Sequence, residues 1–145
     1  MRLAALLLLF AAAPPDELDR RWARHVVCQG FVNQTAVAAD WTGDGRPDVI
    51  TADITAGRER VLLYVAPDWK PVLLHEGTRT IHGAVLDVDG DGRPDFVGAR
   101  YHPGQVYWLK RPADALRQPW PAHVVDEEVD GVHGLLAADV DADGR

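Results

Sequence analysis

Asp87-Val-Asp-Gly-Asp-Gly-Arg-Pro-Asp95 is the stretch of sequence that decides the fold of this chain. Carboxylates stand at its first, third, fifth and ninth positions, and a glycine stands at the sixth. Calcium takes six to eight oxygen ligands, and alternate residues of a tight loop can supply them. The glycine lets the backbone turn, so that the carbonyl of Arg93 at position seven can join the shell. The stretch therefore predicts a calcium-binding loop.

The same pattern occurs three times in the chain. The first copy is Asp40-Trp-Thr-Gly-Asp-Gly-Arg-Pro-Asp48, and the third is Asp139-Val-Asp-Ala-Asp-Gly-Arg145. The copies start 47 residues (40 to 87) and 52 residues (87 to 139) apart. Trp22, Trp69 and Trp120 precede the three loops by 18, 18 and 19 residues. Two markers in phase indicate a repeated structural unit.

The expected ligands are carboxylates, one threonine hydroxyl and the backbone carbonyl of each seventh residue. They are Asp40, Thr42, Asp44, Arg46 and Asp48 in the first loop; Asp87, Asp89, Asp91, Arg93 and Asp95 in the second; and Asp139, Asp141, Asp143 and Arg145 in the third. Because Thr42 is neutral, we expect the first loop to bind calcium more weakly than the second. The expected role of the ion is structural, since it couples folding of the loop to metal binding.

Four short β-branched or alternating segments recur in each period. They are 36–40, 48–52, 60–65 and 71–75 in the first unit, and 83–87, 95–100, 105–110 and 122–126 in the second. A further segment of this kind, His25–Cys28, precedes the first unit, and Cys28 is expected to be a small buried residue in it. Four strands every 47 to 52 residues are typical of a propeller blade. The sequence therefore predicts an all-β, partial β-propeller of four-stranded antiparallel blades, with about two blades plus one inner strand.

An EF-hand is the main competing interpretation of the acidic loops. It requires a bidentate glutamate at position 12, but Thr51 and Gly98 stand there. It also requires flanking helices, whereas the flanks here are β-branched and marked by proline. The pattern therefore favours a loop between strands.

The acidic loop and the strand Asp95-Phe-Val-Gly-Ala-Arg100 together resemble the FG-GAP or VCBS repeat of integrin-like β-propellers. The resemblance extends from Trp22 to Arg145 and implies that each loop joins the innermost strand of a blade to the next strand outward. Arg100 replaces the proline that ends the family's motif, and Thr51-Ala-Asp53 departs further from it. A closed propeller needs four to eight blades, so we expect a fragment truncated at its C-terminus.

The charge of the chain is concentrated in the repeated loops. The formal net charge is -7, and ten of the 22 acidic residues belong to the three loops. No basic stripe suited to nucleic acid is present. Cys28 is the only cysteine, which excludes an internal disulfide framework.

Residues 1–13 combine one arginine, a long apolar run and an alanine-rich end. This outline predicts a secretory signal peptide, followed by a linker over 14–21 and the blades over 22–145. A mis-assigned start and a short buried helix are the alternatives. The expected location is secreted, periplasmic or at the cell surface, with no membrane span beyond the signal. Extracellular calcium is plentiful enough to fill even weak sites.

Histidines mark the ends of the inner strands opposite the acidic loops. His82 and His133 each stand at the start of an expected inner strand, and each is followed by glycine. They could bind a transition metal, act as acid and base, or serve as hydrogen-bonded capping residues there. Arg79, Tyr101 and His102 are expected on loops of the same face, in reach of an anionic or sugar ligand. The tryptophans are expected to be packing anchors, with Trp41 as the exposed exception.

Two functions are compatible with this sequence. The first is a non-catalytic, calcium-stabilised binding or scaffold module, with a protein or carbohydrate ligand on the face opposite the calcium loops. The second is a propeller enzyme, such as a polysaccharide lyase or sugar dehydratase, using histidine and arginine residues at the channel mouth. The resemblance implies both, and fold alone does not choose between them.

Overall fold

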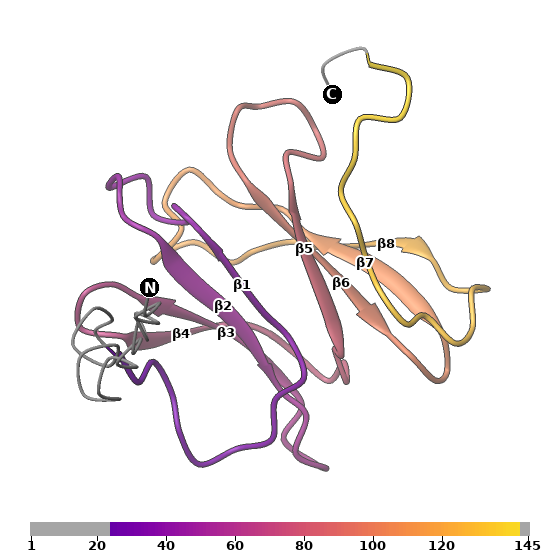
Figure 1. The fold of residues 1–145 in the computed structure, drawn as a ribbon, viewed down its shortest axis with the longest axis horizontal. Coiled ribbons are helices and arrows are strands. Elements are labelled where there is room, and N and C mark those ends of the chain that lie inside the picture. Colours follow the sequence, from indigo (N-terminus) through magenta and orange to yellow (C-terminus); the bar gives the residue numbers. More distant parts are fainter. Residues whose placement is uncertain (1–23, 143–145) are drawn as a thin grey trace, which may run out of the picture.

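The structure, a computed structural model, describes residues 24–142, which contain no helix. Their eight strands form two four-stranded antiparallel sheets that lie side by side (Figure 1). The predicted all-β class with four-stranded blades is confirmed. The expected signal peptide at 1–13, the linker at 14–21, and Trp22, Asp143 and Arg145 lie outside the described residues.

Both sheets are built the same way, with their strands in chain order. The first contains β1 (Ala36–Ala39), β2 (Asp48–Asp53), β3 (Arg60–Val65) and β4 (Lys70–Glu76), and the second contains β5 (His82–Leu86), β6 (Asp95–Arg100), β7 (Gln105–Leu109) and β8 (Ala122–Asp126). The predicted strand bounds agree with these within one residue. The acidic loops connect β1 to β2 and β5 to β6, as the resemblance implied.

Two predicted strand segments are not strands in the structure. His25–Cys28 has no strand assignment, and residues 127–142 contain none either. A strand needs a partner for its backbone hydrogen bonds, and neither segment joins one of the two described sheets. Cys28 is consequently only half-buried and lies outside any strand, which corrects the expectation of a buried strand residue.

The core lies at the junction of the two blades. The inner strands β1 and β5 are in contact (Figure 1), so that the faces of both sheets share one apolar cluster. Its fully buried members include Ile50 and Leu63 from the first blade and Phe96 and Leu109 from the second. Burying an aliphatic or aromatic side chain of this size contributes about 1.5–3 kcal/mol. The shared core holds both acidic loops at one edge of the pair of blades.

Trp41 corrects a sequence-based prediction, because its side chain is completely buried rather than exposed. Its ring packs against that of Trp120, with the centroids 5.9 Å apart and the planes tilted by 60°. The second position of the first loop therefore points into the junction between the blades. Trp120 is 79 residues away (41 to 120) in the sequence, so no local pattern reveals the contact.

Candidate metal centre and inter-blade cavity

The second acidic loop gathers three carboxylates from both of its ends. Ligand atoms of Asp87, Asp89 and Asp95 all lie within 4.8 Å of one another. Asp87 follows the last residue of β5, and Asp95 is the first residue of β6. The hairpin between two antiparallel strands thus brings the first and ninth positions together, and the third position lies between them.

Hydrogen bonds between backbone N–H groups and aspartate side chains hold this loop in shape. The N–H groups of Asp91 and Gly92 donate to the two carboxylate oxygens of Asp87, at 3.0 and 2.8 Å. The N–H of Val88 donates to Oδ2 of Asp95 at 3.1 Å. Gly92 has φ of +80°, a left-handed conformation that L side chains rarely adopt. The loop geometry is therefore set by its own aspartates and its sixth-position glycine.

The electrostatics of the loop favour a bound cation. Burial raises the pKa of the Asp95 carboxyl, and the neighbouring charges of Asp89 and Asp91 raise it further, against the hydrogen bonds that lower it. Asp95 is the buried member of the group, and a buried carboxylate beside others is costly to ionise unless a positive charge lies near it. Calcium prefers hard oxygen donors of this kind, so the residues fit that ion.

Two basic side chains, one of them from the loop itself, contact carboxylates of the second loop. Lys110 donates from Nζ to Oδ2 of Asp89, and Arg93 donates to Oδ2 of Asp91. The hydrogen bond from Lys110 is the main cause of the lowered pKa of Asp89. Asp91, the expected fifth-position ligand, is therefore engaged by Arg93 instead of joining the three-carboxylate group. Lys110 lies after β7 and 15 residues beyond Asp95 (95 to 110), outside the repeated pattern from which the ligands were expected.

In the first loop, too, the first and ninth aspartates accept backbone hydrogen bonds, but the third residue is a threonine. Asp40 accepts hydrogen bonds from the N–H groups of Gly43, Asp44 and Gly45 at 2.7, 3.0 and 2.9 Å. The fully buried Asp48 accepts from the N–H groups of Thr42 and Ala66. The Thr42 hydroxyl is buried and has no hydrogen-bond partner among residues 24–142. An unpartnered buried oxygen at the third position also fits a hard cation.

Asp44, the expected fifth-position ligand of the first loop, pairs with a basic side chain. Its Oδ2 lies 3.5 Å from Nε of Arg46, and both side chains are exposed to solvent. Within the described part of the chain, the three-carboxylate group is found in the second loop alone. Asp139 and Asp141 belong to the third loop, whose other expected ligands lie outside the described residues.

Arg111 connects the two described loops across the blade junction. Its backbone N–H donates to Oδ1 of Asp95 in the second loop at 2.7 Å. Its Nε donates to the backbone oxygen of Trp41 in the first loop at 2.6 Å. Arg111 is 5% exposed, so the contact is shielded from water. The two acidic loops are therefore parts of one hydrogen-bonded assembly.

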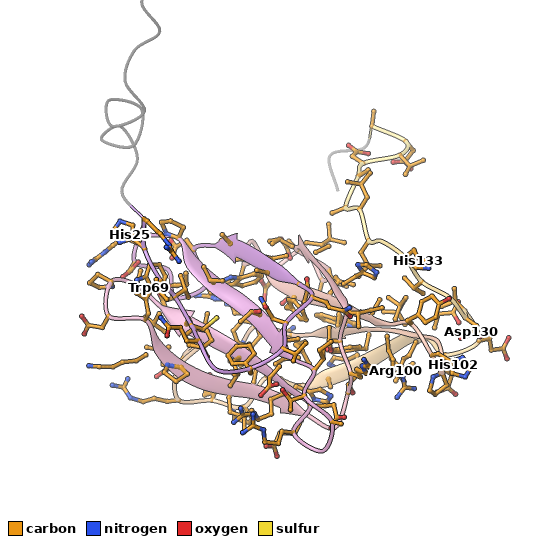
Figure 2. All side chains as sticks on the ribbon, turned by 60° about the horizontal axis from the view of Figure 1, so that its bottom comes forward. His25, Trp69, Arg100, His102, Asp130 and His133 are labelled. Carbon is orange, nitrogen blue, oxygen red and sulfur yellow. The ribbon has the colours of Figure 1, made fainter. Side chains whose placement is uncertain are left out.

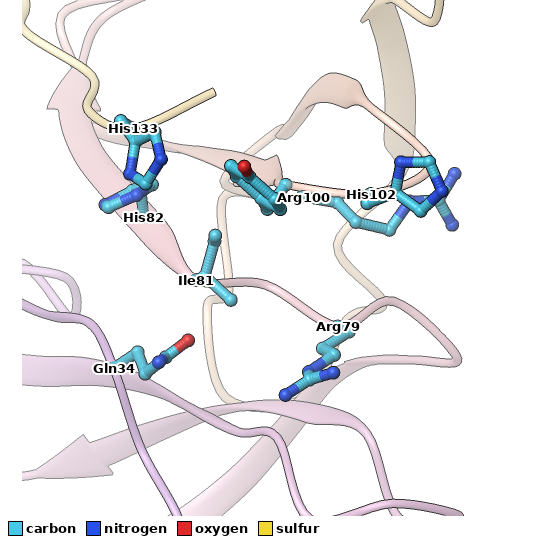
Figure 3. Close-up of a pocket in the computed structure, with 8 residues that line it drawn as sticks. Gln34, Arg79, Ile81, His82, Arg100, His102 and His133 are labelled. Carbon is cyan, nitrogen blue, oxygen red and sulfur yellow. The ribbon is translucent and has the colours of Figure 1, made fainter. Parts of the chain in front are cut away.

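A cavity of about 490 Å³ lies at the opposite ends of the inner strands. We call it the inter-blade cavity; its lining includes Gln34, Arg79, His82, Arg100, Tyr101 and His133. Gln34 precedes β1, Arg79 lies between the two sheets in sequence, and His82 begins β5 (Figure 3). The structure thus brings together the histidines and the loop residues that the sequence analysis expected on one face.

The aromatic and imidazole rings of the cavity contact one another. The rings of His82 and His133 have centroids 6.4 Å apart, and Tyr101 packs edge-on against His133 at 4.8 Å. His102 lies beside Asp130 (Figure 2), with Nδ1 3.1 Å from a carboxylate oxygen. His102 therefore has an acidic partner, which the sequence analysis did not identify.

A direct backbone contact positions the His133 side of the cavity. The carbonyl of Val129 packs so closely on Gly104 that a Cβ there would lie 1.6 Å from the Val129 oxygen. The N–H of Gly131 also donates to the Tyr101 carbonyl at 3.0 Å. Only a glycine at 104 permits this approach, which holds the segment before His133 against the β6–β7 turn.

Residues 87–145 match the family model described as FG-GAP-like repeat. No solved structure matches the chain. Among residues 24–142, no helix has the length and apolar character needed to cross a lipid bilayer. The matched region begins at Asp87 and therefore includes the second acidic loop and the whole of β6 to β8.

Proposed function

We propose that this chain, which carries an FG-GAP-like repeat over residues 87–145, is part of a β-propeller-like binding module whose acidic loops bind calcium. The convergence of Asp87, Asp89 and Asp95 is the observation that carries the proposal. Three carboxylates within 4.8 Å repel one another, and a divalent cation removes that repulsion. Thr42 would contribute a neutral oxygen to the corresponding site of the first loop.

The proposed role of the ion is to stabilise the blades. Bound calcium supplies positive charge at the loop that joins the inner strand to its neighbour. Asp95 already accepts hydrogen bonds from the backbone N–H groups of Val88 and Arg111. A bound cation would reduce the repulsion between Asp95 and the neighbouring carboxylates. It would thereby strengthen the connection between the second loop and the blade junction. Metal binding of this kind is linked directly to folding stability.

Export is part of the same proposal. The apolar run within residues 1–13 has the outline of a secretory signal, and calcium sites of moderate affinity fill readily outside the cell. We therefore propose that the protein is secreted, periplasmic or held at the cell surface. N-terminal sequencing of the protein recovered from the culture medium or periplasm tests this. Recovery only from the cytoplasm with Met1 or Arg2 at its start would contradict it.

The binding surface is proposed to lie on the face opposite the acidic loops, where it would take a protein or carbohydrate ligand. The inter-blade cavity supports this choice because it is formed by residues of both blades and its rings are partly exposed. Calcium would thus stabilise the framework, while the other ends of the strands present the ligand site. An enzyme such as a polysaccharide lyase or sugar dehydratase is the second candidate, since His82, His133 and Tyr101, whose side chains can act as acid or base, line one cavity.

Thermal unfolding with and without calcium tests the metal part of the proposal. A ligand that binds only the folded state at 100 times its Kd stabilises that state by about 2.7 kcal/mol. For a domain of this size, that corresponds to a Tm rise of roughly 5–10 °C. The Asp89→Asn variant should show a smaller rise, since it removes one carboxylate of the group. Equal melting temperatures in excess calcium and in excess chelator would contradict the proposal.

A further inference from the structure

The inter-blade cavity differs in charge from the rest of the chain. The chain carries 22 acidic residues against 15 basic ones, yet none of the residues that line this cavity is acidic. Two arginines, Arg79 and Arg100, contribute to its wall, together with three histidines, of which His102 contacts the carboxylate of Asp130 just outside the lining. A concave, cationic site in an acidic protein selects for anions, because the field of the surrounding carboxylates repels them elsewhere.

Arg79 is held in place by two buried threonines. Thr78 and Thr80 are 8% and 0% exposed, so the residue between them projects outward. Thr80 hydrogen-bonds the hydroxyl of Tyr107, and Thr78 hydrogen-bonds His75 at 3.0 Å. The N–H of Ile81 donates to the carbonyl of Ala99 at 2.9 Å. Arg79 therefore extends from a fixed segment of backbone into the cavity (Figure 3).

The guanidinium of Arg79 has no acidic partner within the described residues. The ion pairs among residues 24–142 use other basic groups, and neither Arg79 nor Arg100 takes part in one. Arg100 donates from Nε to the Pro103 carbonyl at 2.6 Å, which orients its side chain along the cavity wall. An arginine without a carboxylate partner is available to bind one from a ligand, through two parallel hydrogen bonds.

The other lining groups suit a small polar ring. Gln34 offers both a donor and an acceptor, and His82 and His133 offer ring nitrogens for hydroxyl groups. Tyr101, which is 44% exposed, offers an aromatic face on which the apolar side of a sugar ring can pack. A cavity of about 490 Å³ holds a ligand of one or two sugar rings.

We propose that the inter-blade cavity binds a sugar acid, with Arg79 pairing with its carboxylate and Tyr101 packing on its ring. This inference rests on the binding-module part of the proposed function and names the chemical class of its ligand. It does not depend on whether the acidic loops hold calcium. Binding is expected to weaken as salt concentration rises, because the principal contact is between exposed charges.

The test is a calorimetric titration of the purified protein with D-galacturonate, in calcium and at constant ionic strength. The uncharged probes are galactose and the methyl ester of galacturonate, and acetate and inorganic phosphate report on the anion alone. We expect saturable galacturonate binding in the range of about 0.1–10 mM, as is usual for a small ligand with few contacts. The ester and galactose should bind at least about tenfold more weakly, because each lacks the charged contact with Arg79.

Two variants make the assignment specific. Arg79→Gln should lose most of the galacturonate affinity, and Arg79→Lys should restore part of it, since it keeps the charge but loses the paired hydrogen bonds. Arg117→Gln is the matched control because Arg117 is an exposed arginine that does not line the cavity and is paired with Asp114. It should bind galacturonate as the unchanged protein does.

The outcomes separate this inference from the proposed function. Galacturonate binding that is absent, equal to that of galactose, or unaffected by Arg79→Gln would overturn the sugar-acid site. Equal binding of acetate and galacturonate would also overturn it, since a general anion site would explain both. A calcium-dependent Tm in the same samples would leave the metal part of the proposed function intact.

Discussion

Lys110 donates a hydrogen bond from Nζ to the carboxylate of Asp89, within the group of aspartates proposed to bind calcium. In the first blade, Val65 stands at the matching position, because Tyr64 and Leu109 pair with Val49 and Phe96, the residues that follow the ninth-position aspartates. The second loop therefore has an internal cation, and the first has an apolar residue in its place.

Replacing this internal cation should strengthen calcium binding. Lys110→Val should raise the calcium affinity of the second loop several-fold, because the ion no longer competes with an ammonium group for Asp89. Lys110→Arg keeps the positive charge and is the matched control. Calcium titration by calorimetry measures the change. Unchanged or weaker binding in Lys110→Val would mean that the lysine does not compete with the ion.

Arg111 should contribute more to stability than an exposed arginine does. Arg111→Met keeps most of the apolar volume but removes the buried hydrogen bond to the Trp41 carbonyl. Leaving a buried carbonyl unpaired costs about 1–3 kcal/mol. Arg117→Met, which removes an exposed ion pair, should cost less than about 1 kcal/mol. Urea unfolding measures both free energies, and equal losses would contradict the bridging role of Arg111.

Asp53 should make stability depend on acid pH. Burial by itself raises the pKa of Asp53, but hydrogen bonds from Thr55 and Arg60 outweigh it and lower the pKa from 3.8 to about 2. A lowered pKa in the folded state stabilises the protein above the unfolded pKa, and this contribution is lost as pH falls toward about 2. The shift corresponds to about 2 kcal/mol.

The Asp53→Asn variant checks this dependence. It should be less stable than the unchanged protein near neutral pH, and the difference should shrink as pH falls from about 4 to about 2. Urea unfolding at a series of pH values gives both curves. A constant difference across that window would show that the carboxylate of Asp53 is not the group responsible.

Gly104 should be intolerant of any side chain. Gly104→Ala places a Cβ 1.6 Å from the Val129 oxygen, so the segment that carries His133 must move. Displacing packed backbone costs about 1–3 kcal/mol, and the inter-blade cavity should lose its His133 wall. Gly134→Ala is the control, since a Cβ there meets no atom within 4 Å. Equal stability and equal galacturonate binding in the two variants would contradict the close contact.

Much of the fold could be predicted from the sequence. Short β-branched and apolar segments bounded by proline, glycine and aspartate gave the eight strand bounds within one residue, because these residue types set local strand and turn preferences. The segment His25–Cys28 and the expected inner strand of the third unit are not strands in the structure. Strand formation depends on a partner as well as on local pattern.

The candidate sites were only partly predictable. Loop spacing identified Asp87, Asp89 and Asp95, because their separation is fixed by one short hairpin. Lys110 follows β7 and Trp120 precedes β8, so their contacts with Asp89 and Trp41 follow from the packing of the blade. Long-range contacts of this kind leave no periodic signal in one sequence.

The stoichiometry of calcium binding tests most directly whether the acidic loops bind calcium. Calorimetric titration of the metal-free protein should show saturable calcium binding, and Asp89→Asn should remove or strongly weaken one site. Asp68→Asn is the matched control because Asp68 is an exposed aspartate paired with Lys70 outside the loops. It should bind as the unchanged protein does. Saturable binding that Asp89→Asn leaves intact, or no binding at millimolar calcium, would contradict the central claim.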